Sequence, residues 1–161
     1  MKKAEEKTNV MRILEQSKVN YKAHSYIDTG AISGLEVAEV LHQDPGSVFK
    51  TLVTVGKSNN HYVFIIPVDK ELDLKKAAAA VKEKSISMIK SKELLGLTGY
   101  IHGGCSPVGM KKFFKTTIDK SAESHETIMF SAGKIGYQVE TSLEELKKVI
   151  EFQLEDISTE E

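Results

Sequence analysis

Cysteine, long apolar runs and excess charge are all scarce in this sequence, and each shortage excludes a class of protein. Cys105 is the single cysteine among 161 residues, so no disulfide can form within the chain. The longest apolar runs, residues 62–68 and 77–81, are far shorter than the roughly 18 residues of a membrane-spanning helix. The charged first residues do not lead into the apolar segment of a secretory signal. We therefore expect a soluble protein of the reducing cytoplasm, with no membrane partner.

The charge balance limits how the chain can meet nucleic acid. Its 22 Lys and Arg against 23 Asp and Glu give a net charge of −1. Proteins that hold nucleic acid by charge alone are usually basic overall. An RNA partner would therefore have to meet a local basic patch or be delivered by another protein.

Patterns of apolar and capping residues predict one domain, 1–161, of mixed helices and strands. Helices are expected after Thr8, from Asp73 to Val81, over residues 91–97, and after Ser33 and Ser142, both of which begin a capping box. The expected strands cover residues 21–26, 47–55, 62–68, 86–89, 116–118, 127–130 and 137–140, of which the second and third form a hairpin. The acidic end, 155–161, is expected to be a frayed, solvated tail. Because strands and helices do not alternate strictly, we expect an α/β fold of the α+β type: a mixed, partly closed sheet or barrel with helices packed outside.

Lys50 is the first candidate for chemistry. In the strand 47–55 the two-residue period places Lys50 on one side with Val48 and Leu52, and Phe49 and Thr51 on the other. Both sides are largely apolar, so the lysine should point into the interior or a pocket, where an unpartnered ammonium is costly. Such a lysine can act as a base or hold a substrate carbonyl or phosphate. A strand-end lysine that reaches water is the alternative, and the pattern by itself favours neither.

Two glycine-rich segments are candidates for ligand binding. The loop Gly103-Gly-Cys-Ser-Pro-Val-Gly109 would allow backbone N–H groups to approach a ligand, as in an oxyanion hole, although a structural turn is its more common use. The segment Ser131-Ala-Gly-Lys-Ile-Gly136 resembles part of a phosphate-binding loop but lacks the G-x-x-x-x-G-K-[ST] spacing. We expect a tight hairpin there, without a nucleotide site.

Cysteine and histidine give no independent support for a reactive or metal centre. His102 precedes Cys105 by three residues, yet catalytic pairs usually come from distant segments and a lone cysteine is more often inert. The five histidines show no metal-binding spacing, so no metal and no other cofactor are expected. Tyr26 and Ser33 flank a glycine-containing segment that is long enough to form a mobile lip on a pocket.

Several segments taken together resemble the YbaK/EbsC family. The resemblance runs in order from about Thr8 to Ile150. It is carried by residues 33–38, 48–53, 66–77, 97–112 and 131–136 and by the helix after residue 142. These proteins are the freestanding relatives of the editing domain inserted in bacterial prolyl-tRNA synthetases. The YbaK type implies an aminoacyl-tRNA deacylase that acts on Cys-tRNA(Pro).

The resemblance also implies a set of site residues. The essential lysine of the family falls on Lys50. Its G-x-x-x-P loop, its serine-glycine turn and its pocket mouth supply the implied substrate-binding positions, which are Tyr26, Ser33, Gly103, Gly104, Ser106, Pro107, Ser131 and Gly133.

In this family the cysteine thiol of the substrate attacks its own ester carbonyl, which releases a cyclic thiolactone and free tRNA. The resemblance therefore implies that Lys50 orients the aminoacyl group or the terminal ribose, that loop N–H groups hold the carbonyl oxygen, and that Cys105 is dispensable. It implies aminoacyl-tRNA and, transiently, prolyl-tRNA synthetase as partners. The candidate lysines for the tRNA phosphates are Lys75, Lys76, Lys111, Lys112, Lys115 and Lys134.

Three alternatives stay open at this point. The chain could hydrolyse Ala-tRNA(Pro) with water as the nucleophile. It could be a non-catalytic module that binds aminoacyl ends or a synthetase, in which case loss of Lys50 removes no turnover. Thiol redox chemistry at Cys105 is the third alternative, and it predicts a depressed thiol pKa.

Overall fold

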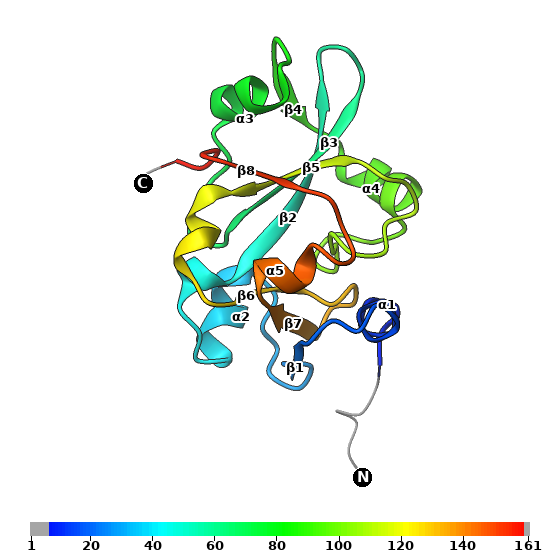
Figure 1. The fold of residues 1–161 in the computed structure, drawn as a ribbon, viewed down its shortest axis with the longest axis vertical. Helices are drawn as coiled ribbons and strands as arrows, with labels where there is room; N and C mark the ends of the chain where they lie inside the picture. The colour runs from blue at the N-terminus through cyan, green and yellow to red at the C-terminus, as the bar shows by residue number, and fades with distance from the viewer. Residues whose placement is uncertain (1–6, 160–161) are drawn as a thin grey trace.

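The computed structural model describes residues 7–159, which form two β-sheets with helices around them (Figure 1). The α-helices are α1 (Asn9–Gln16), α2 (Gly34–Val40), α3 (Leu74–Val81), α4 (Ser91–Thr98) and α5 (Leu143–Leu146), and the 3-10 helices are η2 (Pro45–Ser47) and η3 (Lys120–Ser124). The strands are β1 (Lys22–Ser25), β2 (Phe49–Gly56), β3 (His61–Pro67), β4 (Ile86–Met88), β5 (Lys115–Asp119), β6 (Ile128–Ser131), β7 (Tyr137–Thr141) and β8 (Gln153–Glu155). No helix within this part of the chain is long and apolar enough to cross a membrane.

The strands form one antiparallel sheet and one mixed sheet. The antiparallel sheet has the order β1-β7-β6, and the mixed sheet has the order β4-β2-β3-β5-β8, with parallel pairing at β3-β5 and β5-β8. A parallel bridge between Val48 and Met129 joins the two sheets. The predicted mixed α/β fold is confirmed, but the predicted partial closure into a barrel is wrong, because both sheets are open. Within residues 7–159, β4 pairs with β2 only over Thr54–Gly56, so the first half of β2 has β3 on one side and no ladder on the other.

Apolar side chains fill the space between the sheets and cover one outer face. The main core contains Phe49, Val53 and Ile65 from the mixed sheet and Phe130 and Val139 from the antiparallel sheet, and α1 packs against it. A second cluster packs α3 against the opposite face of β3, and a third packs α2 where the two sheets meet. The helices therefore lie outside the sheets, as the sequence predicts.

Side-chain caps explain where several helices begin. The Thr8 hydroxyl accepts a hydrogen bond from the first turn of α1, and Ser33 forms the complete capping box predicted for α2. Ser142 accepts from the Glu145 N–H at 3.1 Å, but the Glu145 carboxylate accepts from the Asn20 N–H at 2.9 Å instead of returning to the cap. The predicted second capping box is therefore only half formed, and α5 ends after about one turn, at Leu146.

The acidic end is ordered as far as the structure describes it. β8 pairs in parallel with β5, and the side chain of Ile157 is fully buried. The Asp119 carboxylate accepts hydrogen bonds from the N–H groups of Ile157 at 3.0 Å and Ser158 at 3.1 Å. The prediction of a frayed tail is wrong for residues 155–159, because apolar burial and these hydrogen bonds attach the segment to the sheet. Residues 160–161 lie outside the described residues.

Candidate active site

A pocket of about 300 Å³ lies beside the first half of β2, where β4 does not pair with it, next to the Val48–Met129 bridge between the two sheets. In Figure 1, β2 runs through the centre of the molecule, with α2 at its lower end and α4 to its right. Val48 and residues 49–52 of β2 line the pocket. The rest of the lining comes from residues 32–34 with Val37 and Val68, from residues 102, 103 and 105 with Leu94, and from Tyr26, Ser131 and Gln138. Ile32, with 75% of its surface exposed, belongs to this lining together with Ser33 and Gly34, so the segment before α2 borders the pocket. The volume suits an aminoacyl group, since small-molecule sites begin at roughly this size.

The pocket brings together five of the residues that the sequence predicts for the site. They are Tyr26, Ser33, Lys50, Gly103 and Ser131, and they come from five separate segments of the chain. Tyr26 follows β1, Ser33 caps α2, and Ser131 ends β6. The pocket therefore depends on the meeting of the two sheets.

Lys50 supplies the positive charge of this pocket. It is half-buried on β2, in register with Ile66 of β3. Among residues 7–159, its ammonium makes no hydrogen bond and no ion pair. Lys50 thus lines a cavity and does not merely extend from a strand end, and its charge is available to a ligand.

Two buried oxygen atoms of the lining lack hydrogen-bond partners among the described residues. They are Thr51 Oγ1 and Gln138 Oε1. An unpaired buried acceptor destabilises a protein by about 1–3 kcal/mol, so such atoms are uncommon in folded proteins. Each oxygen is a hydrogen-bond acceptor on a residue that lines the pocket, although the oxygen atom itself exposes almost no surface. The sequence did not single out either residue for the site, because a threonine and a glutamine within strands carry no distinguishing pattern.

The structure does not bring four predicted residues to the pocket. Gly104 packs against the neighbouring turn, where a Cβ would lie 3.3 Å from the backbone nitrogen of Ile135. Ser106 is fully buried within its loop, and Pro107 lines a different groove. Gly133 has φ +90°, a left-handed conformation that favours glycine, and packs against α1 and Tyr100. These residues shape the two loops around the pocket and do not line it.

Cys105 and His102 both line the pocket, but burial disfavours ionisation of the thiol. Burial raises the pKa of Cys105 to about 12, although a hydrogen bond with Thr98 opposes the shift. Because the thiolate is the nucleophilic form, a thiol with this pKa stays protonated and inert at neutral pH. This result opposes the redox alternative. Within residues 7–159, no group of three or more His, Cys, Asp or Glu side chains could hold a metal ion.

Comparison with known proteins gives consistent matches. The family described as the aminoacyl-tRNA editing domain matches residues 31–149. A protein of Enterococcus faecalis with the provisional name Cys-tRNA(Pro)/Cys-tRNA(Cys) deacylase EbsC is 44% identical over 161 residues, which covers 99% of this chain and 98% of that protein.

Two solved structures share the fold. The hypothetical protein APE2540 has a TM-score of 0.84 at 20% identity, and the match covers 94% of this chain and 100% of that one. A candidate trans-editing enzyme for prolyl-tRNA synthetase has a TM-score of 0.82 at 22% identity, and the match covers 96% of this chain and 99% of that one.

Proposed function

Because this chain belongs to the aminoacyl-tRNA editing domain family, we propose that it is a trans-editing deacylase that removes cysteine from mischarged Cys-tRNA(Pro). The observation that carries the proposal is the pocket around Lys50. It combines an unpaired cation, two unpaired oxygens and an apolar lining that includes Phe49 and Leu94. Such a lining suits an uncharged side chain of the size of cysteine, and the polar atoms suit the ester and the α-ammonium group.

The substrate brings its own nucleophile in the proposed reaction. The cysteine sulfur attacks the ester carbonyl carbon, the C–O bond to the terminal ribose breaks, and the thiol proton passes to the leaving ribose oxygen. The products are a four-membered cysteine thiolactone and free tRNA. Because this ring is strained, the reaction depends on holding the thiol against the carbonyl and on stabilising the developing charge.

The side chains of the pocket have distinct roles in this proposal. Lys50 stabilises negative charge on the carbonyl oxygen as the sulfur attacks. Thr51 and Gln138 accept hydrogen bonds from the α-ammonium group, which orients the aminoacyl moiety. Cys105 takes no part in the reaction, since its thiol remains protonated. Prolyl-tRNA synthetase, as a transient partner, would supply the tRNA selectivity that a chain of net charge −1 does not obtain from long-range attraction.

The test compares three esters and three proteins. Purified wild type, Lys50→Ala and the control Lys57→Ala, which changes an exposed lysine of the β2–β3 turn, are incubated with Cys-tRNA(Pro), Ala-tRNA(Pro) and Ser-tRNA(Pro). We expect wild type and the control to cleave the cysteinyl ester alone, and Lys50→Ala to lose roughly 10²–10³-fold in kcat, as when one oxyanion donor is removed. The seryl ester tests the thiol, because serine has a hydroxyl in its place.

Two outcomes would contradict the proposal in different ways. Cleavage of the alanyl ester would mean that water is the nucleophile and that the specificity is different. No turnover of any ester, even with prolyl-tRNA synthetase added, would overturn the deacylase and leave a non-catalytic binding module.

A further inference from the structure

A second groove lies beside the loop that borders the pocket. It has a volume of about 620 Å³ and lies between residues 107–116 and residues 147–151. Figure 1 shows the segment after α5, in orange to red, curving toward the loops that lead into β5. The loop 103–109 borders both hollows, since Gly103 and Cys105 line the pocket while Pro107 and Gly109 line the groove. Six residues of extended chain span at most about 20 Å, so Gly103 in the pocket and Gly109 in the groove lie within that distance of each other.

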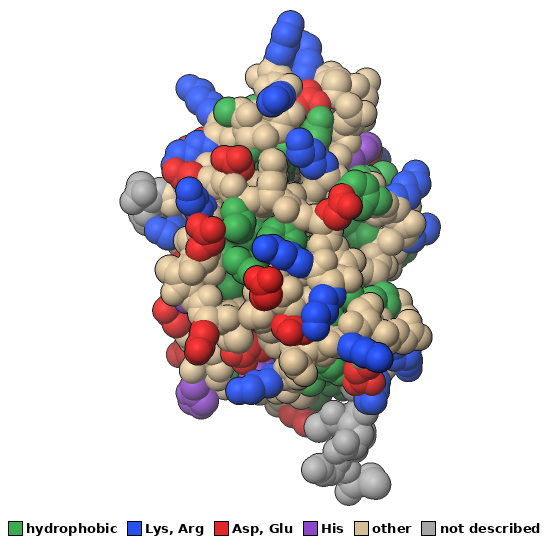
Figure 2. Space-filling view, in the orientation of Figure 1, with side chains coloured by type: hydrophobic (Ala, Val, Ile, Leu, Met, Phe, Trp, Pro, Cys, Tyr) green, Lys and Arg blue, Asp and Glu red, His purple; other side chains and the backbone are tan. Residues whose placement is uncertain are grey.

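The groove combines positive charge with exposed aromatic surface. Its charged lining residues are Lys111, Lys112, Lys147, Lys148 and Glu151. Four cations and one carboxylate line the groove on a chain whose net charge is −1, while Glu144 and Glu145 lie beside Lys147 and Lys148. On the face shown in Figure 2 the two signs are interspersed. Phe113, with 72% of its surface exposed, and Phe114 belong to the same lining. Lysines that follow a backbone and an aromatic ring on which a base can stack are the features of single-stranded nucleic-acid sites.

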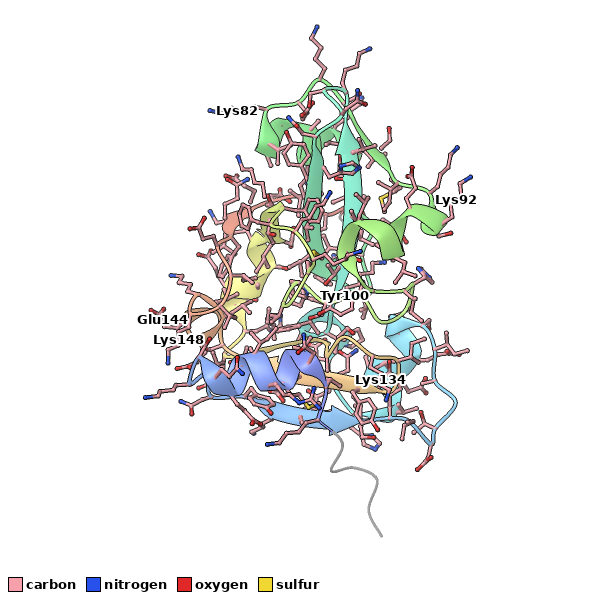
Figure 3. All side chains as sticks on the ribbon, turned by 90° about the vertical axis from the view of Figure 1, so that its right-hand side faces the viewer. Lys82, Lys92, Tyr100, Lys134, Glu144 and Lys148 are labelled. Atoms are coloured by element: carbon pink, nitrogen blue, oxygen red, sulfur yellow. The ribbon has the colours of Figure 1, made fainter. Side chains whose placement is uncertain are left out.

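Two of these lysines are available to a ligand. Lys112 makes no hydrogen bond and no ion pair among residues 7–159, and Lys147 approaches Glu144 only at 4.0 Å. Lys111, in contrast, donates to the last turn of α4 at 3.4 Å, and Lys148 donates to a carboxylate of α5 at 2.9 Å. Figure 3 shows Lys148 and Glu144 together at one edge of the molecule. Lys112 therefore holds unpaired charge, and Lys147 makes only a long ion pair between exposed side chains.

The groove contains only part of the phosphate-facing lysine patch that the sequence suggests. Of the six lysines proposed there, Lys111 and Lys112 line the groove. Lys76 is instead paired with Asp156 at 3.1 Å. The two cations from the other wall come from residues 147–148, which the sequence did not single out.

We infer that this groove binds the single-stranded 3′ end of the tRNA acceptor arm, with phosphates on Lys112 and Lys147 and a base stacked on Phe113. The inference rests on the proposed function, because it requires an aminoacyl ester held at Lys50. In this inference the nucleotides that precede the esterified ribose run from the pocket past the loop 103–109 to the groove, since that loop contributes residues to both linings. The groove therefore supplies binding of the tRNA end, separate from the chemistry at Lys50.

The test uses variants that remove charge or aromatic surface from the groove alone. They are the double variant Lys112→Ala/Lys147→Ala and the single variant Phe113→Ala. The matched control is Lys57→Ala/Lys84→Ala, which removes two exposed lysines from the β2–β3 turn and the turn before β4, at the top of Figure 1. Each protein is assayed on Cys-tRNA(Pro) and on 3′-cysteinyl-adenosine, which carries the ester and the ribose but no phosphate.

We expect the groove variants to lose affinity for the tRNA substrate alone. For the double lysine variant, KM on Cys-tRNA(Pro) should rise roughly three- to tenfold, with kcat retained. The dependence of log(kcat/KM) on log[salt] should become shallower by about 1.4, which is two phosphate contacts at about 0.7 each. Phe113→Ala should raise KM about fivefold or more without changing the salt dependence, because stacking carries no charge. On cysteinyl-adenosine all variants should match wild type.

A binding measurement separates this inference from the proposed function. Fluorescence anisotropy with a dye-labelled acceptor-arm RNA hairpin that carries no amino acid reports binding even if no ester is cleaved. The hairpin is used with and without its single-stranded 3′ nucleotides. We expect the 3′ nucleotides to strengthen binding to wild type and to the control, but not to the double lysine variant. Equal binding and equal KM for groove variant and control would overturn the groove, whereas binding through the groove without turnover of any ester would overturn the deacylase and leave the groove standing.

Discussion

The two unpaired oxygens of the pocket predict substitutions that stabilise the protein while they weaken catalysis. Thr51→Val preserves the shape of the side chain and removes a buried hydroxyl that has no partner within residues 7–159. Gln138→Met removes the amide oxygen at nearly constant length. Because an unpaired buried acceptor costs about 1–3 kcal/mol, each substitution should raise the free energy of unfolding by about 1 kcal/mol. In a chain of this size that corresponds to an increase of about 2–4 °C in Tm.

The catalytic effect should have the opposite sign. In the proposed reaction both oxygens accept hydrogen bonds from the α-ammonium group of the substrate. A hydrogen bond to a charged group contributes about 1.5–3 kcal/mol, and 1.4 kcal/mol is a factor of ten. We therefore expect kcat/KM on Cys-tRNA(Pro) to fall roughly 10- to 150-fold in each variant.

Thr54→Val is the matched control. Thr54 lies on the same strand and is fully buried, but its hydroxyl donates a hydrogen bond to the Tyr62 carbonyl at 3.0 Å. The same chemical change should therefore lower the free energy of unfolding by about 1 kcal/mol and leave kcat/KM unchanged. Urea unfolding and deacylation rates of the three variants and wild type provide both measurements.

The comparison between the two threonines decides the outcome. If Thr51→Val loses stability as Thr54→Val does, the Thr51 hydroxyl is paired in the folded protein and the reasoning fails. If stability rises while kcat/KM is unchanged, the oxygens are unpaired but do not meet the substrate.

Three further predictions concern the thiol, the C-terminal segment and the lip of the pocket. Iodoacetamide at pH 7 should label Cys105 only as fast as the protein opens, because burial raises its pKa to about 12. Cys105→Ala should retain turnover. Rapid labelling would contradict the conclusion that this thiol is unreactive. Burial opposes ionisation of Asp119, but its hydrogen bonds hold the pKa below its ordinary value. The stabilisation by the Asp119 carboxylate is therefore complete above the ordinary pKa of about 3.9 and is lost as the pH falls through the lower pKa of the folded protein. In urea titrations Asp119→Ala should have a free energy of unfolding about 2–4 kcal/mol below that of wild type at pH 7, and this difference should shrink by pH 3. Gly34→Ala should lower the free energy of unfolding by about 1–3 kcal/mol, because its Cβ would lie 2.8 Å from Val68 Cβ. The control Gly96→Ala in α4, where a Cβ meets no atom within 4 Å, should raise it by about 0.5–1 kcal/mol. Equal effects of the two substitutions in thermal unfolding would contradict the packing of Gly34 against Val68.

Local features of this protein could be predicted from the sequence because a few adjacent residues determine them. The caps at Thr8, Ser33 and Asp73 lie at the predicted helix starts, and β2 and β3 form the predicted hairpin. Each depends on a side chain within three residues of its backbone partner or on a two-residue period. Resemblance to a family added the prediction that Lys50 and the loop beginning at Gly103 belong to one site, and both line the same pocket.

Features that join distant segments were decided only by the tertiary structure. Thr51 and Gln138 are 87 positions apart in the sequence, and they share a pocket because the mixed sheet and the antiparallel sheet meet at the Val48–Met129 bridge without closing into a barrel. The end of the chain looked like a solvated tail because its charge is a local property, yet Asp119 and β5 hold it in place. The groove that contains Lys112 and Lys147 likewise exists only after the chain has folded. Pairing between distant segments depends on the packing of the whole core, which no short stretch of sequence contains.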